Sequence, residues 1–161
     1  MDKKIIIGAV FAVAIIAVAA IALSGNDKDD SNNSGSAPVG YFDYSMSTKT
    51  SFIASGGGTI TPSTGNVFVV AYISLKNVSY ASGIIESVNN FALMYGAVKY
   101  TWSVSYVFYP GHADSNMKYM PGGQGSAYYV FEVPSSIVLS NAKIVWDWYP
   151  SNVAYDPSQF A

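Results

Sequence analysis

The chain has 161 residues, of which 50% are apolar and only 11% are charged, and its formal net charge is −2. It has no arginine, and a weakly acidic chain of this kind is a poor partner for nucleic acid, because phosphate binding needs a basic surface. The absence of cysteine excludes disulfides, thiolate catalysis and cysteine zinc sites. A single histidine excludes a multi-histidine centre, so we expect neither a cofactor nor a metal.

The N-terminal segment predicts a membrane anchor. Residues 5–23 carry no charged or strongly polar side chain, and a helix of that length spans about 28 Å, close to the roughly 30 Å apolar core of a bilayer. Lys3 and Lys4 precede the run and acidic residues follow it. The positive-inside rule therefore keeps residues 1–4 in the cytoplasm and places the rest outside the cell membrane. The alternative is a signal peptide cut after Ala22, which would make the protein secreted.

Residues 24–39 form the predicted tether. Their side chains are almost all polar and cannot bury enough surface to offset the entropy of ordering. We therefore expect a disordered linker with a root-mean-square reach of about 20 Å. Asn32 begins an Asn-Asn-Ser sequon in this accessible stretch and is a candidate glycosylation site.

Residues 40–161 predict one all-β domain. Apolar side chains recur at every second position, and clusters of Gly, Pro and Asn separate the runs. No window shows the spacing of an amphipathic helix. About seven strands in this length fit an antiparallel β-sandwich of two sheets, and a small closed barrel is the alternative. The predicted strands are Tyr41–Ser47, Thr50–Ala54, Val67–Lys76, Phe91–Tyr95, Tyr100–Phe108, Ser126–Val133 and Lys143–Tyr149.

Several short motifs recur in a recognisable order. Asn66-Val67-Phe68 opens a strand that ends in Lys76-Asn77, and Phe91-Ala92-Leu93 follows; Pro121-Gly122 then precedes Phe131-Glu132-Val133-Pro134. This order, from residue 65 to about residue 148, resembles the telokin-like, immunoglobulin-like domains of uncharacterised secreted or membrane-anchored prokaryotic proteins. The resemblance implies an immunoglobulin-like sandwich outside the cytoplasm and no assigned catalytic residues. Many members carry an anchoring cysteine, whereas this chain would rely on residues 5–23.

Candidate catalytic groups are few and dispersed. His112 and Asp114 form a His-x-Asp pair that could serve a metal or a hydrolytic dyad, but no Gly-x-Ser-x-Gly motif supplies a nucleophile. A solvated loop histidine is the simpler interpretation. Glu132 and Asp147 interrupt apolar strands, where we expect them to point outward into solvent. The sequence therefore predicts no catalytic residue.

Aromatic side chains are the strongest functional signal. Tyr and Trp offer stiff contact area with a polar tip, which is typical of binding surfaces, although sheet cores also use them. Tyr128 and Tyr129 are adjacent, so one of them must face away from the core. We predict an aromatic binding patch at Tyr128, Trp146 and Trp148. Asn77 begins a second sequon, where a strand gives way to a loop, and is the other candidate glycosylation site.

Together these features predict a membrane-tethered, extracytoplasmic, immunoglobulin-like domain that is not an enzyme. Its partners would be the cell membrane, through residues 5–23, and a protein or glycan of the cell envelope. One alternative is a structural assembly subunit of the pilin type, although the early glutamate of such subunits is missing and the polar tether interrupts the helix. The other alternative is an envelope hydrolase that uses the dispersed carboxylates and His112.

Overall fold

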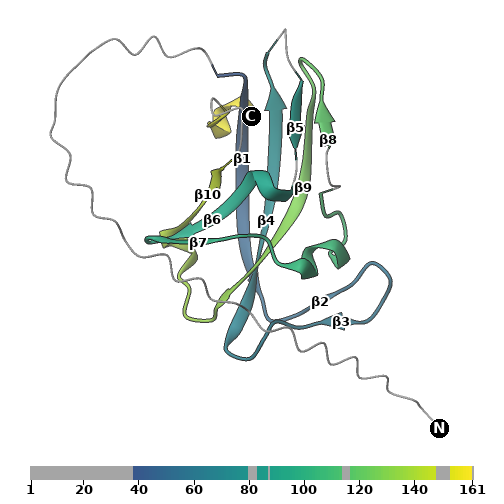
Figure 1. Ribbon diagram of the computed structural model, residues 1–161, viewed down its shortest axis with the longest axis vertical. Helices are drawn as coiled ribbons and strands as arrows, with labels where there is room; N and C mark the ends of the chain where they lie inside the picture. Colours follow the sequence, from purple (N-terminus) through teal and green to yellow (C-terminus); the bar gives the residue numbers. More distant parts are fainter. Residues whose placement is uncertain (1–37, 80–82, 87, 114–116, 148–152, 161) are drawn as a thin grey trace, which may run out of the picture. The chain divides into compact units, whose positions relative to one another are not determined.

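The computed structural model describes residues 38–79, 83–86, 88–113, 117–147 and 153–160 (Figure 1). The predicted cytoplasmic stub, membrane segment and tether as far as residue 37 lie outside these ranges, as do Asp114 and Trp148. Within the described ranges, no helix has the length and apolar character needed to cross a membrane. Val39 packs against the core, and its carbonyl accepts hydrogen bonds from the Val78 and Ser79 N–H groups. The folded domain therefore includes a residue that the sequence assigned to the tether.

The larger of two main sheets has the strand order β11-β1-β4-β9. β1 (Gly40–Lys49), β4 (Asn66–Asn77) and β9 (Gln124–Pro134) pair in antiparallel fashion, and β4 lies in the middle of the three. β11 (Val153–Tyr155) adds to the free edge of β1 in parallel, so the first and last strands of the domain are neighbours. Among the described strands the order is linear, which makes this an open sheet and not the closed barrel considered as an alternative.

The second main sheet is smaller and has the order β10-β6-β7. It consists of β10 (Ala142–Trp146), β6 (Phe91–Tyr95) and β7 (Val98–Tyr100). Two further strand pairs lie outside the main sheets. These pairs are β2 (Phe52–Ile53) with β3 (Thr59–Ile60), and β5 (Ile84–Glu86) with β8 (Met117–Tyr119). The connections between strands include 3₁₀ turns at Val88–Asn90 (η1), Val104–Phe108 (η2), Leu139–Asn141 (η3) and Pro157–Phe160 (η4).

The two main sheets face each other across an aromatic core. Phe91 of β6 is buried between the sheets; its ring lies 5.4 Å from that of Phe42 in β1 and 5.2 Å from that of Tyr129 in β9 (centroid to centroid). Both contacts are edge-on, the arrangement that aromatic quadrupoles favour. The inward-facing residues of β4 and β9, at every second position, complete this core. Apolar side chains on the opposite face of the sheet are also buried, namely Phe68, Val70 and Val130.

These observations confirm an all-β fold without an α-helix in the described ranges. The predicted strands at 67–76, 91–95 and 126–133 correspond to β4, β6 and β9. Each of them has one face buried between the two sheets, and β4 is also buried on its other face at Phe68 and Val70. The short strands β3, β5, β7, β8 and β11 were not predicted, because two or three residues are too few to show a period.

The predicted strand at Tyr100–Phe108 is wrong. β7 ends at Tyr100, and the chain then turns into η2. Ser103 caps this turn, since its hydroxyl accepts from the Ser105 N–H at 3.3 Å and its carbonyl accepts from the Tyr106 N–H at 2.9 Å. The serine cap therefore overrides the strand preference of the aromatic and β-branched residues around it.

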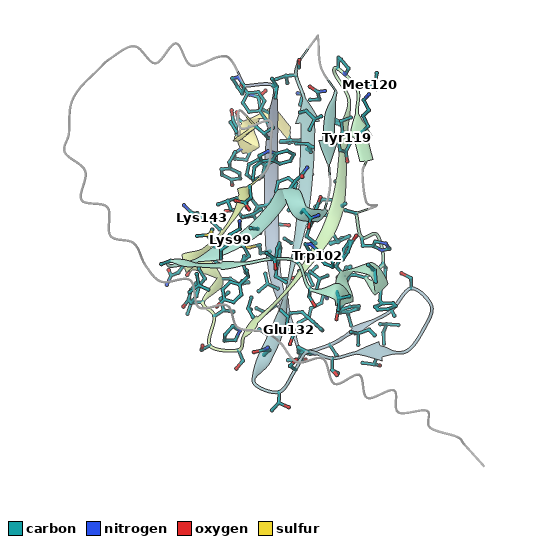
Figure 2. The ribbon with its side chains drawn as sticks, viewed as in Figure 1. Lys99, Trp102, Tyr119, Met120, Glu132 and Lys143 are labelled. Carbon is teal, nitrogen blue, oxygen red and sulfur yellow. The ribbon has the colours of Figure 1, made fainter. Side chains whose placement is uncertain are left out.

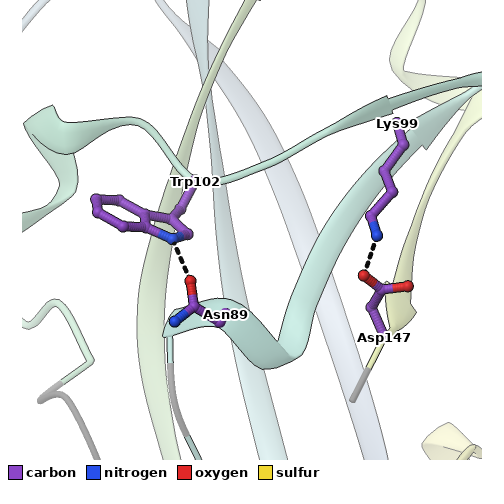
Figure 3. A network of polar contacts seen from close by, with 4 residues as sticks. All are labelled: Asn89, Lys99, Trp102 and Asp147. Carbon is purple, nitrogen blue, oxygen red and sulfur yellow. Dashed lines mark hydrogen bonds and ion pairs between the residues drawn. The ribbon is translucent and has the colours of Figure 1, made fainter. Parts of the chain in front are cut away.

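Polar contacts at the small sheet hold the start of this segment in place (Figure 3). The indole N–H of Trp102 donates to the Asn89 side-chain oxygen at 2.8 Å, which joins the segment after β7 to η1. Lys99 of β7 forms an ion pair with Asp147, which follows β10. Both connections link segments more than ten residues apart in the sequence, so they fix how the loop leaves the sheet.

A candidate ligand groove on the outer face of the large sheet

The face of the large sheet that points away from the small sheet carries paired tyrosines. Tyr72 of β4 lies directly opposite Tyr128 of β9, and directly opposite residues share a face. Their rings lie 4.9 Å apart, and the Tyr72 hydroxyl is 2.5 Å from the Ser126 hydroxyl. Tyr129 is fully buried on the other face, which confirms that one of the two adjacent tyrosines points outward.

A third tyrosine reaches this face from the loop after η2. The ring of Tyr109 lies 5.2 Å from that of Tyr128 and 4.9 Å from that of Phe52 in β2. The loop is fastened to the edge of β9, because the Tyr128 N–H donates to the Gly111 carbonyl at 3.0 Å and the Ala113 N–H donates to the Tyr128 carbonyl at 3.3 Å. Gly111 has a φ of 73°, a left-handed conformation that turns the loop back onto the strand.

β1 supplies the polar side of the site. Ser45, Ser47 and Lys49 alternate along the strand and lie opposite Tyr72, Val70 and Phe68, respectively, so they share the outer face. They border an open groove of about 340 Å³, at the lower end of the usual size range of small-ligand sites. We call it the tyrosine groove and define it by Ser45, Ser47, Lys49, Tyr72, Tyr109 and Tyr128.

The tyrosine groove is neutral apart from one lysine. Burial, with a smaller contribution from neighbouring Tyr128, raises the pKa of Tyr109, so its phenol remains protonated and able to donate a hydrogen bond at neutral pH. Across the described ranges, no carboxylate lies within ion-pair distance of the Lys49 ammonium. The groove therefore combines three aromatic rings, several hydroxyl groups and one lysine that forms no ion pair with a described carboxylate.

Of the predicted aromatic patch, only Tyr128 belongs to this groove. Trp146 lies directly opposite Phe91 in the small sheet, and the two rings pack edge-on with centroids 4.7 Å apart. Its ring therefore faces the core, which corrects the expectation that it would form an exposed platform. Trp148, the third predicted member, falls outside the described ranges. The structure thus does not bring Tyr128 and Trp146 together on one surface.

The two sequons have different outcomes. Asn77 is completely buried; its side-chain amide donates to the Tyr119 carbonyl at 2.9 Å, and its oxygen accepts from the Ser79 N–H at 2.9 Å. A folded domain therefore does not present Asn77 to a glycosylating enzyme, and the candidate assignment is corrected. Asn32 falls in the part of the chain that the structure does not describe.

The candidate catalytic side chains lie in separate places. The His112 ring packs edge-on against Tyr106, and its Nδ1 is 2.9 Å from the Tyr109 carbonyl. Glu132 accepts hydrogen bonds at the start of β4, and Asp147 pairs with Lys99 at the small sheet. Among the described residues no group of three or more His, Asp or Glu side chains could hold a metal ion.

Sequence reasoning missed Ser45, Ser47, Lys49, Tyr72 and Tyr109 as members of one site. A signal was available for Tyr72, because it interrupts the outer face of an otherwise apolar strand. Its position opposite Tyr128 depends on the register of two strands more than fifty residues apart, which the sequence does not encode locally.

No protein-family model matches this chain, and no curated protein does so either. A crystal structure of a conserved hypothetical protein from Bacillus anthracis is similar to it, with a TM-score of 0.46. The two sequences are 16% identical, and the match covers 64% of this chain and 78% of that chain.

Proposed function

We propose that this chain is a non-enzymatic binding domain that recognises a glycan of the cell envelope through its tyrosine groove. The observation that carries the proposal is the groove itself, where the rings of Tyr72, Tyr109 and Tyr128 meet the hydroxyls of β1. Aromatic rings pack against the C–H faces of a sugar, and hydroxyl groups exchange hydrogen bonds with its substituents. The stiff tyrosine rings provide both at low entropic cost.

A glycan fits this groove better than a folded protein partner. The groove is small and open, and its contacts are spread over one strand, its two neighbours and a loop. Such a site matches a few linked sugar units, whereas a stable protein interface buries about 800 Å² on each side.

The proposal includes the anchor and the fold family suggested by the sequence. Residues 5–23 would hold the domain at the outer surface of the cell membrane, and retention or cleavage of that segment decides between a tethered and a secreted protein. The two open, facing sheets are antiparallel apart from the β1–β11 pair, and they support an immunoglobulin-like sandwich of the telokin-like kind. In sandwiches of this class, loops and one sheet face carry function, and here the groove combines both.

Co-sedimentation with insoluble envelope polysaccharide from the source cells tests the proposed function. The full chain would be kept in polyoxyethylene detergent, because a sugar-headed detergent could occupy the groove. We expect the unaltered chain to sediment with the polysaccharide and Tyr72→Ala to lose at least about tenfold in affinity, since stacked aromatics contribute roughly 0.5–1.5 kcal/mol beyond their burial.

Tyr155→Ala is the matched control for this experiment. Tyr155 is exposed to a similar degree, 51% against 39% for Tyr72, but lies in β11 at the other edge of the large sheet. Its removal should leave co-sedimentation unchanged. Equal binding by the Tyr72→Ala variant, with an unfolding midpoint like that of the unaltered chain, would overturn the assignment of the groove.

A further inference from the structure

Among the described residues, Lys49 is the one cation that borders the tyrosine groove. Lys49 is the last residue of β1 and is half-buried, yet no carboxylate of the described ranges pairs with it. The aliphatic stem of a half-buried lysine lies along its neighbours while the ammonium stays at the surface, where it can pair with an anion that a ligand brings.

The two carboxylates on the same face are already committed. Glu132 lies in the same cross-strand row as Lys49, but Phe68 stands between them and the Glu132 carboxylate accepts hydrogen bonds from Ser63 and Asn66. Asp43 is six residues earlier on β1, and its oxygen accepts from the Tyr44 N–H at 2.7 Å. Neither carboxylate neutralises Lys49, so the described side chains of the groove carry a net positive charge although the whole chain has a net charge of −2.

We propose that the ligand is an acidic glycan whose uronic-acid carboxylate pairs with Lys49 while its pyranose ring packs on the groove tyrosines. This inference rests on the proposed function and specifies the chemistry of its ligand. A uronic acid carries its carboxylate directly on the sugar ring, so one rigid unit presents an apolar C–H face and an anion together. Ser45 lies opposite Tyr72, and Ser47 lies between Ser45 and Lys49 on the same face, so both hydroxyls would meet the sugar hydroxyls.

Three immobilised polymers separate the parts of this proposal. Polygalacturonate provides rings and carboxylates, its fully methyl-esterified form provides the same rings without charge, and polyglutamate provides carboxylates without sugar rings. We expect the full chain, in polyoxyethylene detergent and about 0.1 M salt, to bind polygalacturonate at least about tenfold more tightly than either other polymer. Binding should weaken as salt is added, because a partly exposed ion pair is screened.

Variants at Lys49 test whether this lysine binds the uronic-acid carboxylate. Lys49→Met keeps the aliphatic stem and removes the charge, so it should lose about tenfold in affinity for polygalacturonate and several-fold less than that for the methyl ester. Lys49→Arg should restore most of the binding. Lys143→Met is the control, because Lys143 is an exposed lysine of β10 in the other main sheet (Figure 2).

The outcomes distinguish this inference from the proposed function. Equal binding to both galacturonate polymers, unchanged in Lys49→Met, would refute acid recognition and leave glycan binding intact. Equal binding to polyglutamate would refute the role of the sugar ring. Failure to bind any of the three polymers would refute the uronic-acid ligand, while co-sedimentation with envelope polysaccharide would still decide whether the groove binds a glycan.

Discussion

The carboxylate of Glu132 holds the turn that leads into β4. It accepts hydrogen bonds from the Ser63 N–H at 2.8 Å and from the Asn66 side-chain amide at 2.9 Å. Burial acts to raise the pKa of Glu132, but the hydrogen bonds from Asn66 and Ser63 together outweigh it and hold the pKa below its usual value. An outward-facing carboxylate on an apolar strand therefore has a structural role here.

We expect Glu132→Gln to destabilise the domain by about 1 kcal/mol at pH 7, because a charged acceptor is replaced by a neutral one in a partly solvated site. A carboxylate with a depressed pKa stabilises the fold above its unfolded pKa of roughly 4.3, and this contribution is lost as the pH falls through the folded value. Urea unfolding at pH 7 and pH 3 should therefore show a difference that disappears in acid. A difference that persists at pH 3 would contradict this account.

The sequence correctly predicted the orientation of some single side chains. The outward orientation of Glu132 and Tyr128 follows from the period of β9, which its strong apolar face makes easy to read. The same reasoning failed for Trp146, because alternation tells which residues share a face and not which face meets the core. That choice depends on the opposite sheet, where Phe42 and Tyr129 surround the Phe91 ring against which Trp146 packs.

At the scale of elements, β8 and β9 are kept together by a close contact that needs a glycine. A Cβ atom on Gly125 would lie 2.5 Å from Cε1 and 2.6 Å from Oη of Tyr119, closer than any real contact. Tyr119 is buried at the end of β8, and the turn from Met120 onward leads directly into β9 (Figure 2). The absence of a side chain at position 125 thus lets the tyrosine ring lie close against the neighbouring strand.

We expect Gly125→Ala to cost about 1–3 kcal/mol of folding stability, because the buried ring must move. Gly56→Ala is the control, since a Cβ atom at that position would have no atom within 4 Å and the φ of Gly56 is not in the left-handed region. The cost at Gly125 should largely vanish when Tyr119→Leu is also present, which a double-mutant cycle of urea unfolding would measure. Additive effects would show that the contact is not the cause.

The long strands were predictable from the sequence, but the strands with which they pair were not. β4 has 12 residues and β9 has 11, and each shows in the sequence as a long run rich in β-branched and aromatic residues. The short strands β5 and β8 pair with each other across about thirty residues of intervening chain, a connection that no local pattern encodes. The prediction of a strand at Tyr100–Phe108 also failed, because the segment after Tyr100 forms η2, whose first turn is capped by Ser103.

For the molecule as a whole, β11 is the edge strand that covers the free edge of β1 in the large sheet. Val153 is buried in the core, the Asp156 N–H donates to the Phe42 carbonyl at 3.1 Å, and the Lys76 ammonium donates to the Gln159 carbonyl at 3.1 Å. The last residues therefore connect to both β1 and β4, although they are far from them in sequence. No periodic signal in a three-residue strand could have shown this.

We expect a chain that ends at residue 152 to lose at least about 3 kcal/mol of stability, from the burial of one valine and several backbone hydrogen bonds. Urea unfolding followed by tryptophan fluorescence would measure the loss. Val153→Ala alone should account for about 1–2 kcal/mol of it. An unchanged midpoint for the shortened chain would mean that the sheet is complete without β11.

The tyrosine groove could not be predicted as a whole, because it depends on the alternation of one strand, the register of two others and the position of a loop. The alternation of β1 places Ser45, Ser47 and Lys49 on one face, the register of β4 with β9 pairs Tyr72 with Tyr128, and the loop after η2 brings Tyr109 to them. The sequence signals the first of these, and only the folded chain provides the other two.

The long antiparallel pairing of β1 with β4 also determines how the domain would respond to mechanical tension. The chain enters at Gly40, and the ladder continues without a break from Gly40 opposite Asn77 to Lys49 opposite Phe68. A pull on the N-terminal end, directed along the strand, would slide β1 past β4 and load all of those backbone hydrogen bonds in shear. Opening them one after another, as a zipper does, would need a pull across the strands. A ligand bound at Lys49 would pull on one end of β1 while the N-terminal segment pulls on the other end, so the force would run along the axis of this strand.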